Sequence, residues 1–375
     1  MKVFSIKKSL LQICCACLAL TLGWNDADAQ GLQTDVRLPG DRPSALVTTG
    51  VFYQKYVLDG DRHIEEVSFP VYLAVPIGRS SGISLRASPA TVNGQNLTPI
   101  SGLSDAQLQL SHAATLRGSS FVWSLGLNLP SGKRALTQEE LATTVQLSRN
   151  FFDFRTPAFG QGLNVSPGVT WAFPAGDLLV LGIGVAYQYK GGFKPLEGMD
   201  ESYQPGSEIL ITGGVDVRIA QGAAISGDVT YTRYGTDKIG SEAVFESGDR
   251  VVATVQLLRH QGFDELRVVG RFRSRGKGSL PAPGADATPA LQTLANQLDV
   301  FTSYRMETTS ETSVGLHAGV HYFDESDVFS SKLLFSAGVT PEMRLADAVD
   351  FWTRFSVRLG DFTGLEAGTG LSFRL

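Results

Sequence analysis

Arginine recurs at even spacing along one stretch of this chain. Arg267, Arg271 and Arg273, here called the arginine row, are separated by four and two positions. In an extended strand, residues an even number of positions apart lie on the same face. Guanidinium groups aligned in this way would bind an anion or set the charge selectivity of a pore. They would equally serve as partners of acidic neighbours in a network of ion pairs that stiffens the wall.

The polar faces of other alternating segments carry further ionisable side chains. The basic candidates are Arg305, Arg354, Arg358 and Arg374, the acidic ones are Asp105, Asp216, Asp228, Glu307, Glu342 and Glu366, and His317 shares a face with His321. We expect all of these to point into the interior of a barrel. The two histidines lie about 13 Å apart at a rise of roughly 3.3 Å per residue. This separation is too large for one metal ion, so we predict no metal site and no cofactor.

Nucleophilic catalysis would require a serine and a histidine on adjacent strands, with a third polar group orienting the histidine. The sequence places Ser111 directly before His112, but consecutive residues of a strand point to opposite faces. Glycine-rich pieces such as residues 182–184 lie inside strand-like segments and lack the strand, turn and helix of a phosphate loop. We therefore predict that the chain is not an enzyme.

The segments that carry these residues alternate between apolar and polar positions. Residues 121–129 place Phe, Trp and three Leu at odd positions and Val, Ser, Gly and Asn between them. The same period of two recurs in residues 163–173, 179–189, 209–219, 314–322 and 365–375. A period of two indicates strands with one apolar and one polar face. Such segments run to ten residues or more, as tilted membrane strands do, whereas soluble strands usually have about five or six.

The connectors between these segments alternate in length. Short connectors at residues 173–177, 220–222, 259–263 and 346–348 alternate with long ones at residues 130–162, 190–206, 234–248 and 274–299. Short periplasmic turns and long outer loops are typical of bacterial outer-membrane barrels. We predict an all-β fold, a transmembrane antiparallel β-barrel of 14–16 strands with sixteen preferred. Expected strands start near residues 45, 64, 82, 103, 119, 162, 177, 207, 223, 249, 264, 299, 312, 332, 348 and 363.

Two outer loops are predicted to contain short helices. Thr137 and Glu140 form a capping box, followed by Leu141 and Val145 at helical spacing. Thr288-Pro289 is a second helix start, followed by Leu291, Leu294, Ala295 and Leu298. With Phe151, Phe152, Phe154 and Phe159 nearby, these loops are expected to form a lid or a hydrophobic collecting site. Plain packing of the loops over the barrel mouth is the alternative.

The first 29 residues have the form of a secretory signal peptide. A positively charged start precedes a short apolar stretch, and Ala27-Asp28-Ala29 provides the small residues of a cleavage site. All three cysteines, Cys14, Cys15 and Cys17, lie in this segment, so we expect no disulfide in the exported chain. We predict cleavage after Ala29, a short periplasmic segment at residues 30–44 and a barrel at residues 45–375.

Composition narrows the class of protein further. The 375 residues carry a formal net charge of -5, which argues against a nucleic-acid partner. A mean hydropathy of +0.02 argues against a bundle of transmembrane helices, which would need several apolar runs of roughly 20 residues. The alternating segment at residues 365–375 ends the sequence. We expect the barrel-assembly machinery to read this last strand and outer-membrane lipid to surround the barrel.

Two segments resemble a known family. Residues 102–112 (GLSDAQLQLSH) followed by residues 126–133 (GLNLPSGK) are similar to a recurring pair in outer-membrane transporters related to the long-chain fatty acid transporter and to barrels of aromatic-hydrocarbon degradation pathways. The resemblance covers about 30 residues closely. It implies passive uptake of small, mostly hydrophobic compounds. The long N-terminal hatch of the fatty acid transporters has no counterpart, since only residues 30–44 precede the first expected strand and no Asn-Pro-Ala occurs.

Together these features predict an outer-membrane channel or transporter for passive uptake of small hydrophobic or amphipathic solutes, anionic ones among them. A structural or adhesive outer-membrane barrel with a closed lumen and partner-binding loops is the first alternative. A soluble exported β-protein is the second.

Overall fold

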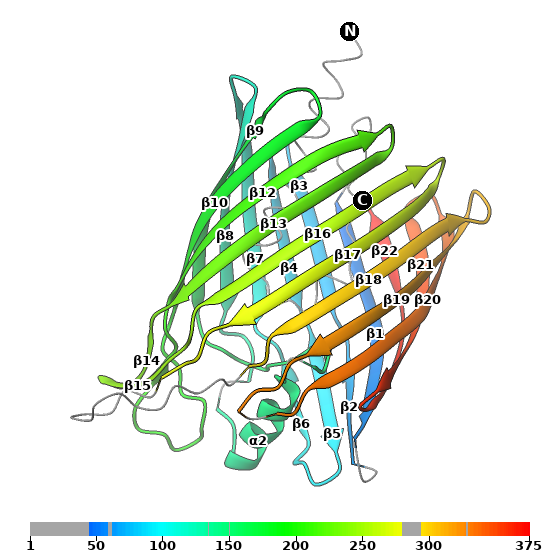
Figure 1. Cartoon of the computed structure of the whole chain (residues 1–375). Coiled ribbons are helices and arrows are strands. Elements are labelled where there is room, and N and C mark those ends of the chain that lie inside the picture. The colour runs from blue at the N-terminus through cyan, green and yellow to red at the C-terminus, as the bar shows by residue number, and fades with distance from the viewer. Residues whose placement is uncertain (1–44, 59–61, 134, 150, 280–293, 328) are drawn as a thin grey trace.

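The computed structural model describes residues 45–58, 62–133, 135–149, 151–279, 294–327 and 329–375. The predicted signal peptide and the segment at residues 30–44 lie outside this part of the chain. The described chain is built almost entirely of strands that wrap into a barrel (Figure 1).

Within the described residues, the strands follow one another along the chain with one helix between them. In order they are β1 (Leu46–Val57), β2 (His63–Ser68), β3 (Val71–Ile77), β4 (Ser81–Ala87), β5 (Pro89–Gly94), β6 (Ile100–Leu103), β7 (Ala106–Leu116), β8 (Ser119–Leu129), α2 (Gln138–Leu147), β9 (Asn164–Pro174), β10 (Leu179–Lys190), β11 (Tyr203–Gln204), β12 (Glu208–Ala220), β13 (Ala223–Tyr234), β14 (Thr236–Ile239), β15 (Glu242–Glu246), β16 (Arg250–Gln261), β17 (Asp264–Arg275), β18 (Gln297–Glu307), β19 (Thr312–Phe323), β20 (Lys332–Ala346), β21 (Val349–Gly360) and β22 (Thr363–Arg374).

Antiparallel pairing closes all of these strands except β11, β14 and β15 into a ring. The strands of the barrel sheet form sixteen spanning segments among the described residues, because β3, β5 and β7 continue β2, β4 and β6 after short breaks. The ring closes where β1 pairs with β22 along its whole length, from Leu46 opposite Arg374 to Val57 opposite Thr363. Closure leaves no sheet edge to aggregate. The predicted all-β class, antiparallel barrel and preferred number of sixteen strands are confirmed.

The two ends of the barrel differ. Short turns join the strands at one end, here called the turn end, and the long connections, such as residues 130–163 between β8 and β9, lie at the other, the loop end. Helix α2 and the small sheet of β11, β14 and β15 lie at the loop end (Figure 1). No helix in the described ranges is long and apolar enough to cross a membrane.

The two faces of the barrel wall also differ. Large apolar side chains such as Ile183, Val229 and Phe355 are exposed on the outside, whereas the inner positions beside them carry Gly, Thr, Ser and charged residues. Aromatic side chains gather near both rims of the outer face. They are Trp123, Trp171 and Phe173 near the turn end and Tyr187, Tyr189, Tyr231 and Tyr322 near the loop end. Strict alternation of side-chain direction along each strand produces this division.

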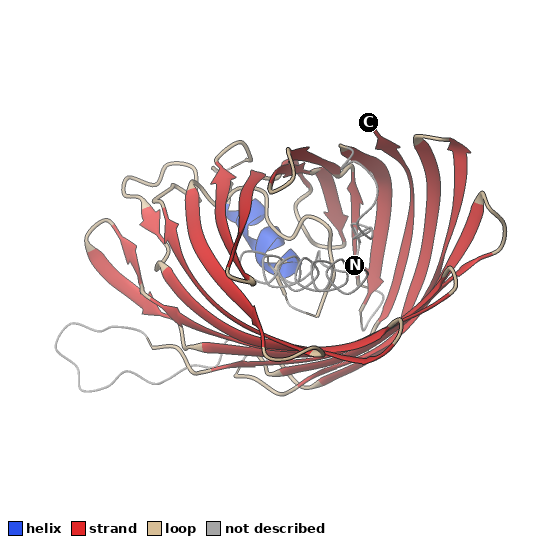
Figure 2. Cartoon of the chain, turned by 90° about the horizontal axis from the view of Figure 1, so that it is seen from above, coloured by secondary structure: helices blue, strands red, loops and turns tan. Residues whose placement is uncertain are grey.

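The long connection between β8 and β9, residues 130–163, folds into the barrel and is called the inward loop. It contains α2, whose predicted capping box is present: Thr137 Oγ1 accepts from the Glu140 amide at 3.2 Å and the Glu140 carboxylate accepts from the Thr137 amide at 3.1 Å. In the view from above, α2 and the rest of the inward loop lie along one side of the ring (Figure 2).

The predicted start of a second loop helix at Thr288-Pro289 lies outside the described residues, and its predicted extension to residue 298 is wrong. Leu291 lies outside the described residues, Leu294 lies in a bend, and Leu298 is the second residue of β18, where it points outward with 46% of its surface exposed. Leu298 satisfies the helical spacing and the alternation of Val300 and Tyr304 at the same time, and the extended pairing with β17 prevails. Val145 also differs from expectation, since it is 55% exposed and does not join the packed face of α2.

Candidate functional site

The neck of the inward loop is closed by the carboxylate of Asp105. Its Oδ1 accepts from the Gly132 amide at 2.8 Å, where the loop leaves β8, and its Oδ2 accepts from the Gln161 amide at 2.7 Å, where the loop returns. Asn128 Nδ2 donates to the same carboxylate at 2.7 Å and to the Gly162 carbonyl at 2.8 Å. These hydrogen bonds fix the inward loop at its base.

Deeper in the barrel, two charged loop residues are paired with the wall. Arg155 contacts Glu366 of β22 at 2.8 Å, and Arg354 of β21 contacts the same carboxylate oxygen at 2.8 Å. Asp153 pairs with Arg358 of β21. Because charges removed from water are costly unless paired, these contacts determine where the loop can rest.

Gln54 of β1 binds the same turn of the loop through both ends of its amide. Its Nε2 donates to the Asp153 carbonyl at 2.5 Å and to Glu366 at 3.2 Å, and its Oε1 accepts from the Arg155 amide at 2.9 Å. The Arg155 guanidinium also lies over the ring of Phe52, 4.2 Å from its centre. Gln54 is completely buried, so the loop is sealed against this part of the wall.

A further anchor follows one residue later in the loop. The Thr156 amide donates to both carboxylate oxygens of Glu66 at 3.2 Å, and Thr156 Oγ1 donates to Ser88 Oγ at 3.1 Å. Glu66 has no exposed surface and Ser88 has almost none. The loop therefore covers the polar inner face of β1, β2 and the β4–β5 strand.

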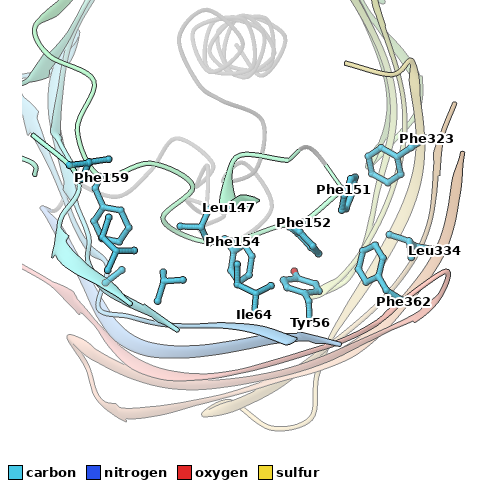
Figure 3. Packing of buried hydrophobic residues seen from close by; sticks show 14 residues of the cluster. Tyr56, Ile64, Leu147, Phe151, Phe152, Phe154, Phe159, Phe323, Leu334 and Phe362 are labelled. Atoms are coloured by element: carbon cyan, nitrogen blue, oxygen red, sulfur yellow. The ribbon is translucent and has the colours of Figure 1, made fainter. Parts of the chain in front are cut away.

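The phenylalanines of the inward loop form the main apolar core. Phe151, Phe152, Phe154 and Phe159 are at most 5% exposed, and they pack with Leu147 against Tyr56, Ile64, Ala90, Val92, Ile100, Phe323, Leu334 and Phe362. Figure 3 shows these rings between the loop and the strands. These four rings therefore pack the loop against the wall, as in the alternative of plain loop packing, because their surfaces are buried in that contact. Leu141 packs against the edge of this cluster.

The arginine row occupies the other side of the ring. Arg267, Arg271 and Arg273 lie on the inner face of β17, opposite Leu258, Thr254 and Val252 of β16. Counted around the ring, β17 lies half a circumference from the β4–β5 strand that the loop covers. The three arginines are half-buried, and so is Thr254 of β16, the strand between β17 and β13. Arg267 donates to Gln256 at 2.8 Å.

Structure places the other predicted wall residues on the inner face as well. The inward-facing positions are Asp216 and Asp228 on β12 and β13, Arg305 on β18, His317 and His321 on β19, Arg354 and Arg358 on β21, and Glu366 and Arg374 on β22. Arg305 pairs with Glu342 at 2.8 Å, and Arg374 pairs with Asp350 at 2.5 Å. Ion pairing therefore accounts for some of the charged side chains on the inner face of the wall. Within the described chain, no three His, Cys, Asp or Glu side chains meet as metal ligands would.

The loop residues that bind the wall were missed by sequence reasoning. Asp153, Arg155 and Thr156 lie in a connector with no periodic pattern, and Gln54 and Glu66 read as ordinary polar positions of two strands. Only the charges of Asp153 and Arg155 among the phenylalanines at 151, 152 and 154 could have signalled a buried segment that needs charged partners.

Comparison with known proteins identifies no family for this chain. No family model matches it, and no curated protein matches it. Among solved structures it is similar to OprB of Pseudomonas putida (9% identity, 88% of this chain and 94% of that chain, TM-score 0.46) and OpdL of Pseudomonas aeruginosa (12%, 88% and 98%, TM-score 0.44). It is also similar to an outer membrane channel from Pseudomonas putida F1 (8%, 90% and 97%, TM-score 0.39). The resemblance to the fatty acid transporter family stays a prediction.

Proposed function

We propose that the chain is an outer-membrane channel for passive diffusion of small solutes, with a preference for anions. The observation that carries the proposal is the division of the barrel wall into an apolar outside and a polar, arginine-bearing inside. A barrel with exposed Ile183, Val229 and Phe355 around its waist would be insoluble in water. In a bilayer, the same surface is the one that lipid requires.

The dimensions support the membrane setting. A typical spanning strand has 12 residues, as β13 does. At a rise of about 3.3 Å per residue and a tilt near 40°, it spans roughly 30 Å, the thickness of the hydrocarbon core. Tyrosines near the rims bind polar partners at the strand ends, as Tyr304 does with Asp264 at 2.7 Å. Rings with one wet edge are typical of membrane interfaces.

The distribution of residues in the lumen supports a constriction with the inward loop on one side and arginines on the other. The inward loop covers the inner face of β1, β2 and the β4–β5 strand, while the arginine row half a circumference away keeps part of its surface accessible. A solute passing the loop would therefore meet guanidinium groups on one side, and such rings or rows of cations attract anions. The buried phenylalanines leave little apolar surface for collecting a hydrophobic solute, so the proposal favours charge over hydrophobicity as the basis of selection.

Planar-bilayer recording tests the proposal. The full chain should conduct, and its reversal potential in a salt gradient should indicate anion preference. Replacing Arg271 and Arg273 with Ser should move the reversal potential toward cation preference. The matched control is the double replacement of Arg233 and Arg259, which removes the same charge from the outward faces of β13 and β16 and should leave the reversal potential unchanged.

Three results would contradict the proposal at different levels. Equal selectivity of the two double variants would assign the arginine row to wall stiffening alone. The absence of current and of liposome swelling under all conditions would favour the closed barrel with partner-binding loops. Recovery of the protein from the soluble periplasm, without heat-dependent migration on gels, would favour the soluble β-protein.

A further inference from the structure

Three inward-facing residues on adjacent strands form a hydrogen-bonded chain. His321 of β19 lies directly opposite Asp299 of β18, and its Nδ1 is 2.8 Å from Asp299 Oδ1. On the other side, His321 Nε2 is 3.1 Å from Ser336 Oγ of β20. Both distances lie within the range that links nucleophile, base and orienting acid in serine hydrolases.

The directions of these hydrogen bonds follow from the chemistry of the groups. An ionised carboxylate only accepts, so Nδ1 of His321 carries the proton and donates to Asp299. The neutral ring then has an unprotonated Nε2, which accepts the hydroxyl hydrogen of Ser336. Gln297 Nε2 donates to both oxygens of Asp299 at 2.9 Å and holds the carboxylate in place. The Ser336 hydroxyl is thus hydrogen-bonded to Nε2 of His321, the nitrogen that would take its proton.

Burial and space favour reaction at Ser336. Asp299 and His321 are each 6% exposed, whereas Ser336 is half-buried. Gly319, directly opposite Ser336, lies beneath the pair, since a Cβ there would come 2.8 Å from Ser336 Oγ and 3.2 Å from His321 Nε2. Any side chain at Gly319 would push the two apart. On the next strand, Arg358 holds the register position opposite Ser336, and its guanidinium is paired with Asp153 of the inward loop.

We propose that Ser336, His321 and Asp299 form a hydrolytic triad in the lumen wall that cleaves small carboxylic esters entering the barrel. Ser336 Oγ forms a bond to the ester carbonyl carbon while its proton passes to His321 Nε2. Collapse of the tetrahedral intermediate breaks the bond to the leaving alcohol, which takes that proton. Water, deprotonated by His321, then attacks the acyl-serine, releases the carboxylic acid and restores the hydroxyl.

Labelling of the full chain by a fluorophosphonate tests the proposal. The serine oxygen would bond to phosphorus, fluoride would leave, and His321 would take the proton. Mass spectrometry should find the phosphonyl group on Ser336. Ser336→Ala and His321→Ala should abolish labelling, and Asp299→Asn should slow it and the hydrolysis of 4-nitrophenyl acetate by about 10³- to 10⁴-fold.

Matched controls keep the result specific. Ser303→Ala and His317→Ala alter an inward serine and an inward histidine that face each other across β18 and β19, and they should leave labelling intact. Heat-dependent migration and unchanged conductance of Ser336→Ala show that the barrel is folded, which separates this test from that of the channel. A folded, conducting barrel that is not labelled, or is labelled equally after His321→Ala, would overturn the proposal.

Discussion

Replacing Glu366 with Gln should release the inward loop from the wall. Glu366 neutralises two arginines at 2.8 Å, Arg155 of the loop and Arg354 of β21, and its side chain is only 11% exposed. Breaking a buried ion pair by removing one partner costs about 3–5 kcal/mol. Only Arg155 regains water when the loop leaves, so we assign about half of this cost, roughly 2 kcal/mol, to the seated loop. The open population then rises roughly 30-fold.

Single-channel recording measures this change as more frequent openings of larger conductance, and limited proteolysis measures it as faster cleavage within residues 130–163. Glu342→Gln is the matched control. It alters the ion pair with Arg305, whose side chain is 39% exposed, so it should cost less than about 1 kcal/mol and leave the current unchanged. Arg155→Gln breaks the same contact from the loop side and should reproduce the openings. If Glu366→Gln and Arg155→Gln behave like Glu342→Gln, the ion pair does not hold the loop and the reasoning is refuted.

Three further predictions concern the neck, the helix and the outer face. Gly132→Ala should unseat the base of the loop and raise its protease sensitivity, because a Cβ there would lie 1.8 Å from a backbone carbonyl oxygen. The hydrogen bond from Lys133 lowers the pKa of Glu140. The ionised Glu140 carboxylate therefore stabilises α2 fully at pH values above its ordinary pKa of 4.5, and this stabilisation is lost as the pH falls below that value. Hydrogen exchange of α2 should accelerate in acid, and Glu140→Gln should remove that dependence; an acid response that survives the substitution would assign it elsewhere. Val229→Arg, on the outward face at mid-strand, should cost about 2–4 kcal/mol in bilayer refolding titrations, whereas Thr254→Arg on the inner face should cost clearly less, and equal costs would argue against lipid around the barrel.

The strands and their faces could be predicted from sequence because a period of two is a local property. Each strand alternates by itself, so the inward direction of Arg271, Asp228 or Glu366 follows without knowledge of its neighbours. The number of strands follows from the same pattern together with the alternating length of the connectors. Even the interrupted strands near the N-terminus keep their alternation on both sides of the breaks.

The arrangement of the lumen could not be predicted because it depends on contacts across strands and loops. Asp299, His321 and Ser336 are separated by 22 and 15 positions, and only the register of β18, β19 and β20 aligns them. The inward course of the loop depends likewise on the pairing of Asp153 and Arg155 with charged side chains of β21 and β22, the last two strands. Local spacing does not predict such long-range contacts, and at Leu298 it indicated a helix where the chain forms β18.

The position of the inward loop has a consequence for assembly. Its charged turn binds Gln54 of the first strand and Glu366 of the last, so it lies across the seam where the two ends of the sheet meet. The binding site for the loop does not exist until that seam has closed. An unfinished barrel therefore has a loop without a place to dock, and the constricted lumen is formed only as the final step of assembly. The loop therefore links the first and last strands across the seam as well as narrowing the lumen.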